Sequence, residues 1–187
     1  AGLAAGLFTA DEAISNMELI ASLRKPVGFY DPKNPAMKAA ADPDDKDEVK
    51  SIEEASRNTR SPMLSFSNTD MAFKDNVLVA GSYHGFNIYD LGDDGIPSLI
   101  SSVICPGGQG DVSIVENLLI MSVQDTRGRV DCGLQGAGSE PTPERFRGIR
   151  IFDISDLTMP MQVGAVQTCR GSHTCLLYTS PSPRDLS

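Results

Sequence analysis

The sequence predicts an all-β fold: a partial β-propeller of about two four-stranded antiparallel blades with an added N-terminal closing strand. The first observation behind this prediction is that residues 70–81 are echoed by residues 111–122. The second is that residues 85–91 are echoed by residues 148–154. The third is that short β-branched and aromatic runs lie between Gly and Asn positions, which is typical of strands joined by turns. A repeat of about 40 residues that holds four short strands is typical of a propeller blade.

Each repeat is expected to contain four strands, of which the first is the innermost. In the first repeat we expect strands at residues 70–74, 77–82, 86–91 and 98–104. In the second we expect them at residues 111–115, 118–123, 149–154 and 162–168. The run from Asn117 to Met121 is almost wholly apolar, which suits a strand that is covered on both faces.

The N-terminal part of the chain adds a third echo, because residues 18–26 resemble residues 98–106. We therefore expect residues 16–23 to form an outer strand that completes the last blade of a longer propeller, which would remove two exposed sheet edges.

Residues 1–15 are interpreted as a leader or signal-peptide remnant, although a basic n-region is absent. Residues 34–60 are interpreted as a polar insertion and residues 124–147 as a loop insertion. An open arc of two blades is not expected to be a stable monomer.

The last residues differ in origin from the rest. Residues 175–185 read Cys-Leu-Leu-Tyr-Thr-Ser-Pro-Ser-Pro-Arg-Asp, which resembles the translation of a transposase-type sequencing adapter. Residues 175–187 are therefore interpreted as a non-native, adapter-derived tail without function, and such segments are left out of fold reasoning. The residue that natively follows Thr174 is then unknown.

Composition excludes several classes of partner. The chain has 40% hydrophobic and 22% charged residues and a net charge of −9, and no apolar run reaches the ~18–20 residues of a membrane helix. An acidic chain without a Lys/Arg cluster is a poor partner for nucleic acid or an anionic membrane. Nucleic-acid binding and a transmembrane segment are therefore not expected.

Blade topology brings several loops to one end of the molecule, which we call the insertion face. It comprises Tyr83 and His84 and residues 105–110, 124–147 and 169–173. At this end of the innermost strands, corresponding positions of successive blades are expected to surround the mouth of a central channel. The candidate ligand-binding residues are Asn68, Gln109 and His173 at one level, Asp70 and Asp111 at the next, and His84.

Two interpretations of these candidates stay open. Carboxylate and imidazole groups suit a divalent or transition metal ion, so Asp70, Asp111 and His173 are candidate metal ligands. A carboxylate that recurs in each repeat can equally cap backbone N–H groups in a turn. His84 lies in a tight turn and is expected to be a turn residue that lends a hydrogen bond.

All three cysteines that precede the tail lie on the insertion face. Cys132 lies within the loop insertion, and either Cys105 or Cys169 could lie within its reach. We expect a disulfide that involves Cys132, and the pair Cys132–Cys169 is favoured because both belong to the second repeat. A bridge requires Cα atoms within about 7 Å of each other.

Residues 81–90, 105–111, 147–156 and 169–174 carry a Gly-x-x-Ile-x-Asp pattern followed by Pro, or the turns that accompany it. In these residues the chain resembles the LVIVD-repeat family of bacterial β-propellers. The resemblance covers residues 16–174 apart from the polar insertion. It implies a propeller in a secreted or periplasmic protein, and it implies no general reaction.

Two functions follow as hypotheses. The first is an exported propeller scaffold that binds a protein or glycan partner at the cell envelope. The second is a metal-binding propeller or oxidoreductase-like metalloenzyme with a His/Asp ring at the channel mouth. The sequence holds no nucleophile–base motif, no phosphate-binding loop and no paired Cys-x-x-Cys, so an enzyme is not favoured, and the one cofactor implied is a metal ion.

Overall fold

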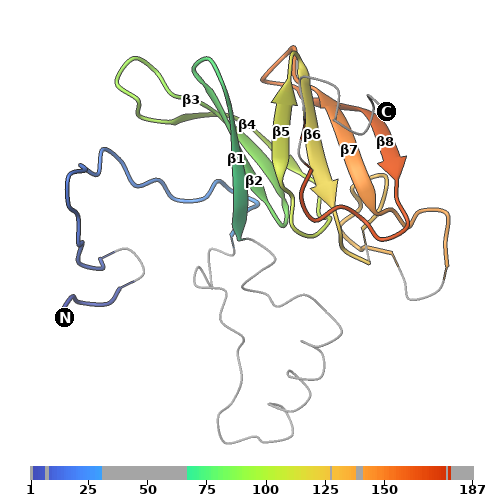
Figure 1. The fold of residues 1–187 in the computed structure, drawn as a ribbon, viewed down its shortest axis with the longest axis horizontal. Coiled ribbons are helices and arrows are strands. Elements are labelled where there is room, and N and C mark those ends of the chain that lie inside the picture. The colour runs from blue at the N-terminus through green and yellow to red at the C-terminus, as the bar shows by residue number, and fades with distance from the viewer. Residues whose placement is uncertain are drawn as a thin grey trace, which may run out of the picture.

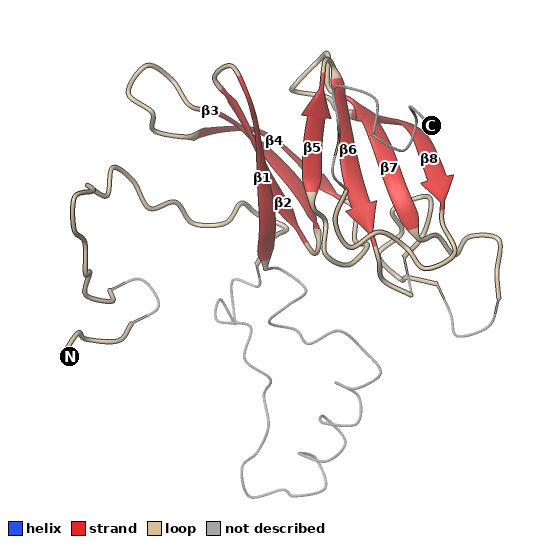
Figure 2. Ribbon diagram, in the orientation of Figure 1, coloured by secondary structure: helices blue, strands red, loops and turns tan. Residues whose placement is uncertain are grey.

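The fold consists of two four-stranded antiparallel sheets, each in the order of the chain (Figure 2). It is seen in a computed structural model that describes residues 2–6, 9–30, 67–126, 128–137, 141–175 and 177. Blade 1 comprises β1 (Asn68–Lys74), β2 (Val77–Ser82), β3 (Gly85–Asp90) and β4 (Ser98–Ile104). Blade 2 comprises β5 (Val112–Val115), β6 (Leu118–Val123), β7 (Gly148–Asp153) and β8 (Met161–Gln167). The predicted fold class is confirmed, and every strand lies within two residues of its expected bounds.

The repeated sequence pattern corresponds to a repeated backbone geometry. Gly85 begins β3 and Gly148 begins β7, with φ angles of +141° and +150°. A Cβ atom on either glycine would lie 1.9 Å from a carbonyl oxygen of the neighbouring outer strand, that of Val103 or Val166. Only glycine fits a strand start of this shape. The repeated Gly that opens both copies of the pattern is therefore an architectural requirement.

The two blades lie side by side with their innermost strands adjacent, β1 against β5 (Figure 1). The core fills the space between them. Blade 1 contributes Val79, Phe86 and Ile88, and blade 2 contributes Leu119 and Met121, all fully buried. Since strand side chains alternate between faces, each blade uses one face for this core and leaves the other for a second contact.

The N-terminal segment does not join a sheet, and Figure 1 shows most of it apart from blade 1. The structure assigns no strand to residues 16–23, and Met17, Ile20 and Leu23 are exposed. The closing strand therefore stays a prediction, as does the leader at residues 1–15. Further along, Phe29 is fully buried, and its ring meets that of His84 edge to face with centroids 5.9 Å apart. This contact holds residues near position 29 against the β2–β3 turn.

Two predicted segments fall wholly or largely outside the described residues: the polar insertion at 34–60 and the tail at 175–187, of which Cys175 and Leu177 are described. The carbonyl of Cys175 accepts a hydrogen bond from the Ser113 hydroxyl at 3.2 Å. No helix in the described part of the chain is long and apolar enough to cross a membrane.

Candidate functional site

The connections that sequence analysis assigned to the insertion face do lie at one end of the two sheets. Figure 1 shows the β6–β7 loop and the segment after β8 at the same, lower end. The β2–β3 turn and the β4–β5 connection reach this end as well, because alternate antiparallel strands finish there. This end therefore brings together segments that are far apart in the sequence.

A short polar chain crosses the boundary between the blades at this face. The Tyr83 hydroxyl donates to Gln109 Oε1 at 3.3 Å. The amide nitrogen of Gln109 in turn donates to Asp111 Oδ1, also at 3.3 Å. Gln109 thus uses both ends of its amide, which holds the tyrosine of blade 1 and the carboxylate that precedes β5 in one network. Two of the predicted ligand-binding residues, Gln109 and Asp111, are brought together here.

Asp111 lies in an unusual electrostatic environment for a carboxylate. Burial raises its pKa above the ordinary value, and the charge of Asp70 adds to that rise. The hydrogen bond from Gln109 and the charge of His173 act in the opposite direction and lower the pKa of Asp111. Asp70 and His173 therefore lie close enough to interact with Asp111 through space, although both side chains are exposed. Three ionisable side chains are therefore coupled electrostatically at this end of the sheets.

The remaining candidates do not join this network in the structure. Asn68 is exposed at the start of β1, where it pairs with Ser82. His84 is half-buried in the β2–β3 turn, where its backbone N–H donates to the Ser82 hydroxyl and its carbonyl accepts from the Cys105 N–H. Its structure fits the predicted role of a turn residue, with a ring that packs on Phe29.

The predicted metal set is not assembled as a coordination site. Among the residues that the structure describes, which include Asp70, Asp111 and His173, no group of three His, Cys, Asp or Glu side chains lies close enough to hold a metal ion. One oxygen of Asp111, Oδ1, already accepts a hydrogen bond from the Gln109 amide. The geometry therefore favours hydrogen bonding over metal coordination.

A disulfide anchors the loop insertion, but its partner differs from the expected one. Cys132 is bonded to Cys105, with Cα atoms 4.4 Å apart, and Cys169 is free and exposed. The predicted involvement of Cys132 is confirmed, and the predicted pair Cys132–Cys169 is wrong. The reason is the path of the loop, which crosses from blade 2 to the buried Cys105, directly after β4, instead of staying above its own blade.

Arg150 explains that path. Its side chain is fully buried in β7. The guanidinium donates to the carbonyls of Cys105 at 3.3 Å and Pro106 at 3.1 Å, and also to the carbonyl of Arg129 in the loop. One cation therefore holds both the end of β4 and the start of the insertion, which brings Cys132 beside Cys105.

Burial disfavours the charged form of Arg150, and its surroundings partly offset that effect. Burial lowers the pKa of Arg150 to about 10, so the side chain is charged at neutral pH. Its guanidinium lies 5.7 Å from the centroid of the Phe146 ring, within the range of a cation–π interaction. A Cβ atom on Gly107 would lie 2.8 Å from the guanidinium, so glycine at that position leaves room for it.

Further contacts order the loop along its length. Arg129 forms a 2.6 Å ion pair with Asp131 and a longer one of 3.9 Å with Glu144. The hydrogen bond from Arg129 holds the pKa of Asp131 far below its usual range. Gln162 of β8 donates to the Val130 carbonyl at 3.0 Å. The insertion is thus fixed to both blades, yet Leu134 stays 66% exposed near its tip.

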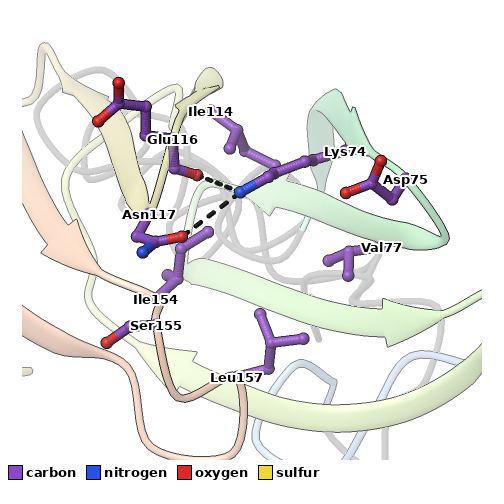
Figure 3. A pocket seen from close by; sticks show the side chains of 9 residues that line it. All are labelled: Lys74, Asp75, Val77, Ile114, Glu116, Asn117, Ile154, Ser155 and Leu157. Atoms are coloured by element: carbon purple, nitrogen blue, oxygen red, sulfur yellow. Dashed lines mark hydrogen bonds between the residues drawn. The ribbon is translucent and has the colours of Figure 1, made fainter.

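A shallow pocket of about 190 Å³ lies at the opposite end of the two sheets (Figure 3). Its apolar lining comes from both blades: Val77, Ile114, Ile154 and Leu157. The Lys74 ammonium reaches across it and donates to the Glu116 carbonyl at 2.7 Å and to Asn117 Oδ1 at 3.4 Å. Neither the repeats nor a motif in the sequence indicated this pocket, because it is formed by three separate turns.

Sequence reasoning also missed Arg150, for which a signal was present. In the run Ile149-Arg-Ile-Phe152, a period of two places Arg150 on the same face as Phe152. A charged side chain on a core face requires buried partners. That pattern could have identified Arg150 as an anchor, although not the segments that it binds.

Comparison with protein-family models and with curated protein sequences gives no match. Among solved structures, the chain is similar to the crystal structure of the computationally designed Ika4 protein, with 14% sequence identity and a TM-score of 0.31. The match covers 61% of this chain and 81% of that one.

Proposed function

We propose that this chain is an exported propeller scaffold of the LVIVD-repeat kind, which binds a protein or glycan partner at the cell envelope through its insertion face. The observation that carries the proposal is the anchored loop: Cys132 is bonded to Cys105, and Arg150 fixes the Arg129 carbonyl to the same site. A surface loop held by a disulfide and a buried cation is pre-organised, which lowers the entropic cost of binding.

The composition of the loop favours a protein partner. Leu134 and Val130 are 66% and 40% exposed, and the ion pairs of Arg129 with Asp131 and Glu144 lie in the same loop. An apolar centre with a polar rim is the usual anatomy of a protein interface. The Tyr83–Gln109–Asp111 network beside the loop offers the hydrogen-bonding groups that a glycan partner would use.

The disulfide supports the same proposal. Disulfides persist in secreted and periplasmic proteins and are rare in the cytosol. The Cys105–Cys132 bridge therefore agrees with export, which the resemblance to secreted propellers also implies.

The test is capture of partners from a cell-envelope extract by the wild-type chain and by a Leu134→Asp variant, with a glycan array as a second arm. Met159→Asp is the matched control, because Met159 is 63% exposed at the opposite end. The proposal predicts proteins that the wild type and the control retain and that Leu134→Asp loses. Equal capture by all three proteins, together with an empty array, would contradict it.

The metal-binding alternative keeps one supporting observation, the interaction of Asp111 with Asp70 and His173. Elemental analysis of the purified protein distinguishes the two functions. A stoichiometric transition metal that is lost in Asp111→Asn would favour the alternative.

A further inference from the structure

Among the residues that the structure describes, none covers the apolar face that β1 to β4 of blade 1 present away from blade 2. Met71 and Phe73 of β1 are 60% and 59% exposed, and Leu99 of β4 is 49% exposed. Leu78 and Tyr89 lie half-buried on the same side, because Leu78 pairs with both Phe73 and Tyr89. Contiguous exposed apolar side chains of this kind mark an interaction surface.

The strand register identifies what this face is built to contact. Met71 and Phe73 of β1 occupy the positions of Val112 and Ile114 of β5. Leu78 likewise occupies the position of Leu119, which is fully buried against blade 1. The open face of blade 1 is therefore equivalent, position by position, to the face through which blade 2 packs against blade 1.

Blade 2 has a second face, which points away from blade 1. It is equivalent to the face of blade 1 that contacts blade 2. Ile149 and Ile151 of β7 correspond to Phe86 and Ile88, which form the contact face of blade 1. Val166 of β8 pairs with Ile149, lies on the same side and is 50% exposed.

The chain after β8 reaches the inner end of this face. There the hydroxyls of Ser172 and Ser122 lie 3.2 Å apart, and Ser113 donates to the Cys175 carbonyl. These contacts lie along β5 and β6. The outer part of the face, at β7 and β8, keeps its apolar side chains half-buried or exposed.

We infer that a second copy of this chain docks head to tail, with its blade 1 face against the blade 2 face of the first copy. The contact repeats the one that the structure already shows between β1–β4 and β5–β8. Because the two surfaces differ, the association is heterologous, and further copies add in the same sense until a ring closes or a filament grows.

Charge opposes this association and gives it a salt dependence. Each copy carries a net charge of −9, so two copies repel each other over the distance that salt does not screen. The association is therefore weakest at low ionic strength and strengthens as salt is added, the reverse of a contact made by ion pairs.

Two single variants test the geometry. Phe73→Glu disables the blade 1 face, and Val166→Glu disables the blade 2 face. Both residues are at least half exposed, so both variants are expected to fold, which circular dichroism verifies. Met159→Glu adds the same charge outside both faces and serves as the control. Mass is measured by sedimentation velocity over a range of concentrations.

The wild type and Met159→Glu are expected to exceed the 20.0 kDa mass of one chain as concentration rises. Phe73→Glu and Val166→Glu alone are expected to stay at that mass. Mixed with each other, they should form a complex of twice that mass, since each retains the face that the other lacks. A wild type that is monomeric at every concentration overturns the inference. So does a Val166→Glu variant that pairs with itself, or a control that fails to associate.

Discussion

The aromatic rings of Phe86 and Phe152 meet edge to face across the boundary between the blades, with centroids 5.0 Å apart and an interplanar angle of 73°. Phe86 lies in β3 and Phe152 in β7. Both are at most 2% exposed, and both belong to the cluster that joins the two sheets. The contact between the blades is therefore a packed core, and the stability of the pair should depend on it.

Phe152→Ala is expected to lower the free energy of unfolding by about 3–5 kcal/mol, because it removes a buried ring and leaves a cavity. Urea unfolding of both proteins at one fixed protein concentration measures the change. Met159→Ala, at an exposed position, should change stability by less than about 0.5 kcal/mol. A double-mutant cycle with Phe86→Ala should give a coupling of about 0.5–1.5 kcal/mol, and zero coupling would mean that the rings do not touch.

Loss of the disulfide should be costly where loss of the free thiol is not. Cys132→Ser is expected to lower the free energy of unfolding by about 2–4 kcal/mol, since the bridge spans 27 residues and restricts the unfolded chain. Cys169→Ser should lie within about 0.5 kcal/mol of the wild type. Peptide mapping without reduction should recover Cys105 and Cys132 on one linked peptide. A linked peptide that contains Cys169 would contradict the structure.

Arg150→Met should release the insertion and destabilise the fold together. It leaves the carbonyls of Cys105, Pro106 and Arg129 without their donor, and an unsatisfied buried polar group costs about 1–3 kcal/mol. Hydrogen exchange should show faster exchange at the Phe146 N–H, which is bonded to the Gly128 carbonyl at 2.8 Å. Arg147→Met is the control, because Arg147 is half-exposed and donates to a single carbonyl, that of Cys169 at 3.4 Å. Equal exchange in both variants would remove Arg150 from its anchoring role.

The strands and the insertion face could be predicted from the sequence because both depend on local pattern. A two-residue period defines a strand, and an antiparallel order decides at which end each loop emerges. Met71 and Val112 show the strength of this signal: they occupy equivalent positions, as the repeat indicated.

The cysteine partner and the metal set could not be predicted in the same way. The loop that holds Cys132 has no periodicity, so its path depends on Arg150 and the carbonyls of Cys105 and Arg129, which are distant in sequence. The repeat predicted that Asp111 and Asp70 lie at one level, and the charge of Asp70 does act on Asp111. The repeat did not show that Gln109 would already occupy an oxygen of Asp111. Side-chain partners across blades are decided by packing, which a single repeat does not encode.

The carboxyl groups of Asp111 and Asp156 should give opposite pH dependences. Burial raises the pKa of Asp111, so the folded state favours its protonated form. Its contribution to stability is present below the ordinary value of 3.8 and is lost as the pH rises through the higher pKa of the folded state. The pKa of Asp156 is lowered by hydrogen bonds from the Thr158 hydroxyl and N–H. Its contribution is present above 3.8 and is lost as the pH falls through its folded-state pKa.

Thermal midpoints of the wild type, Asp111→Asn and Asp156→Ala should therefore be compared from neutral pH to below 3.8. The asparagine keeps an oxygen for the Gln109 amide but carries no charge to bury, so Asp111→Asn should be more stable than the wild type at neutral pH. That gain should vanish in acid, where the wild-type carboxyl is protonated. Asp156→Ala should be less stable at neutral pH and approach the wild type in acid. A neutral-pH loss of stability in Asp111→Asn would mean that the charge of Asp111 is stabilised at the channel mouth, as a bound cation would require.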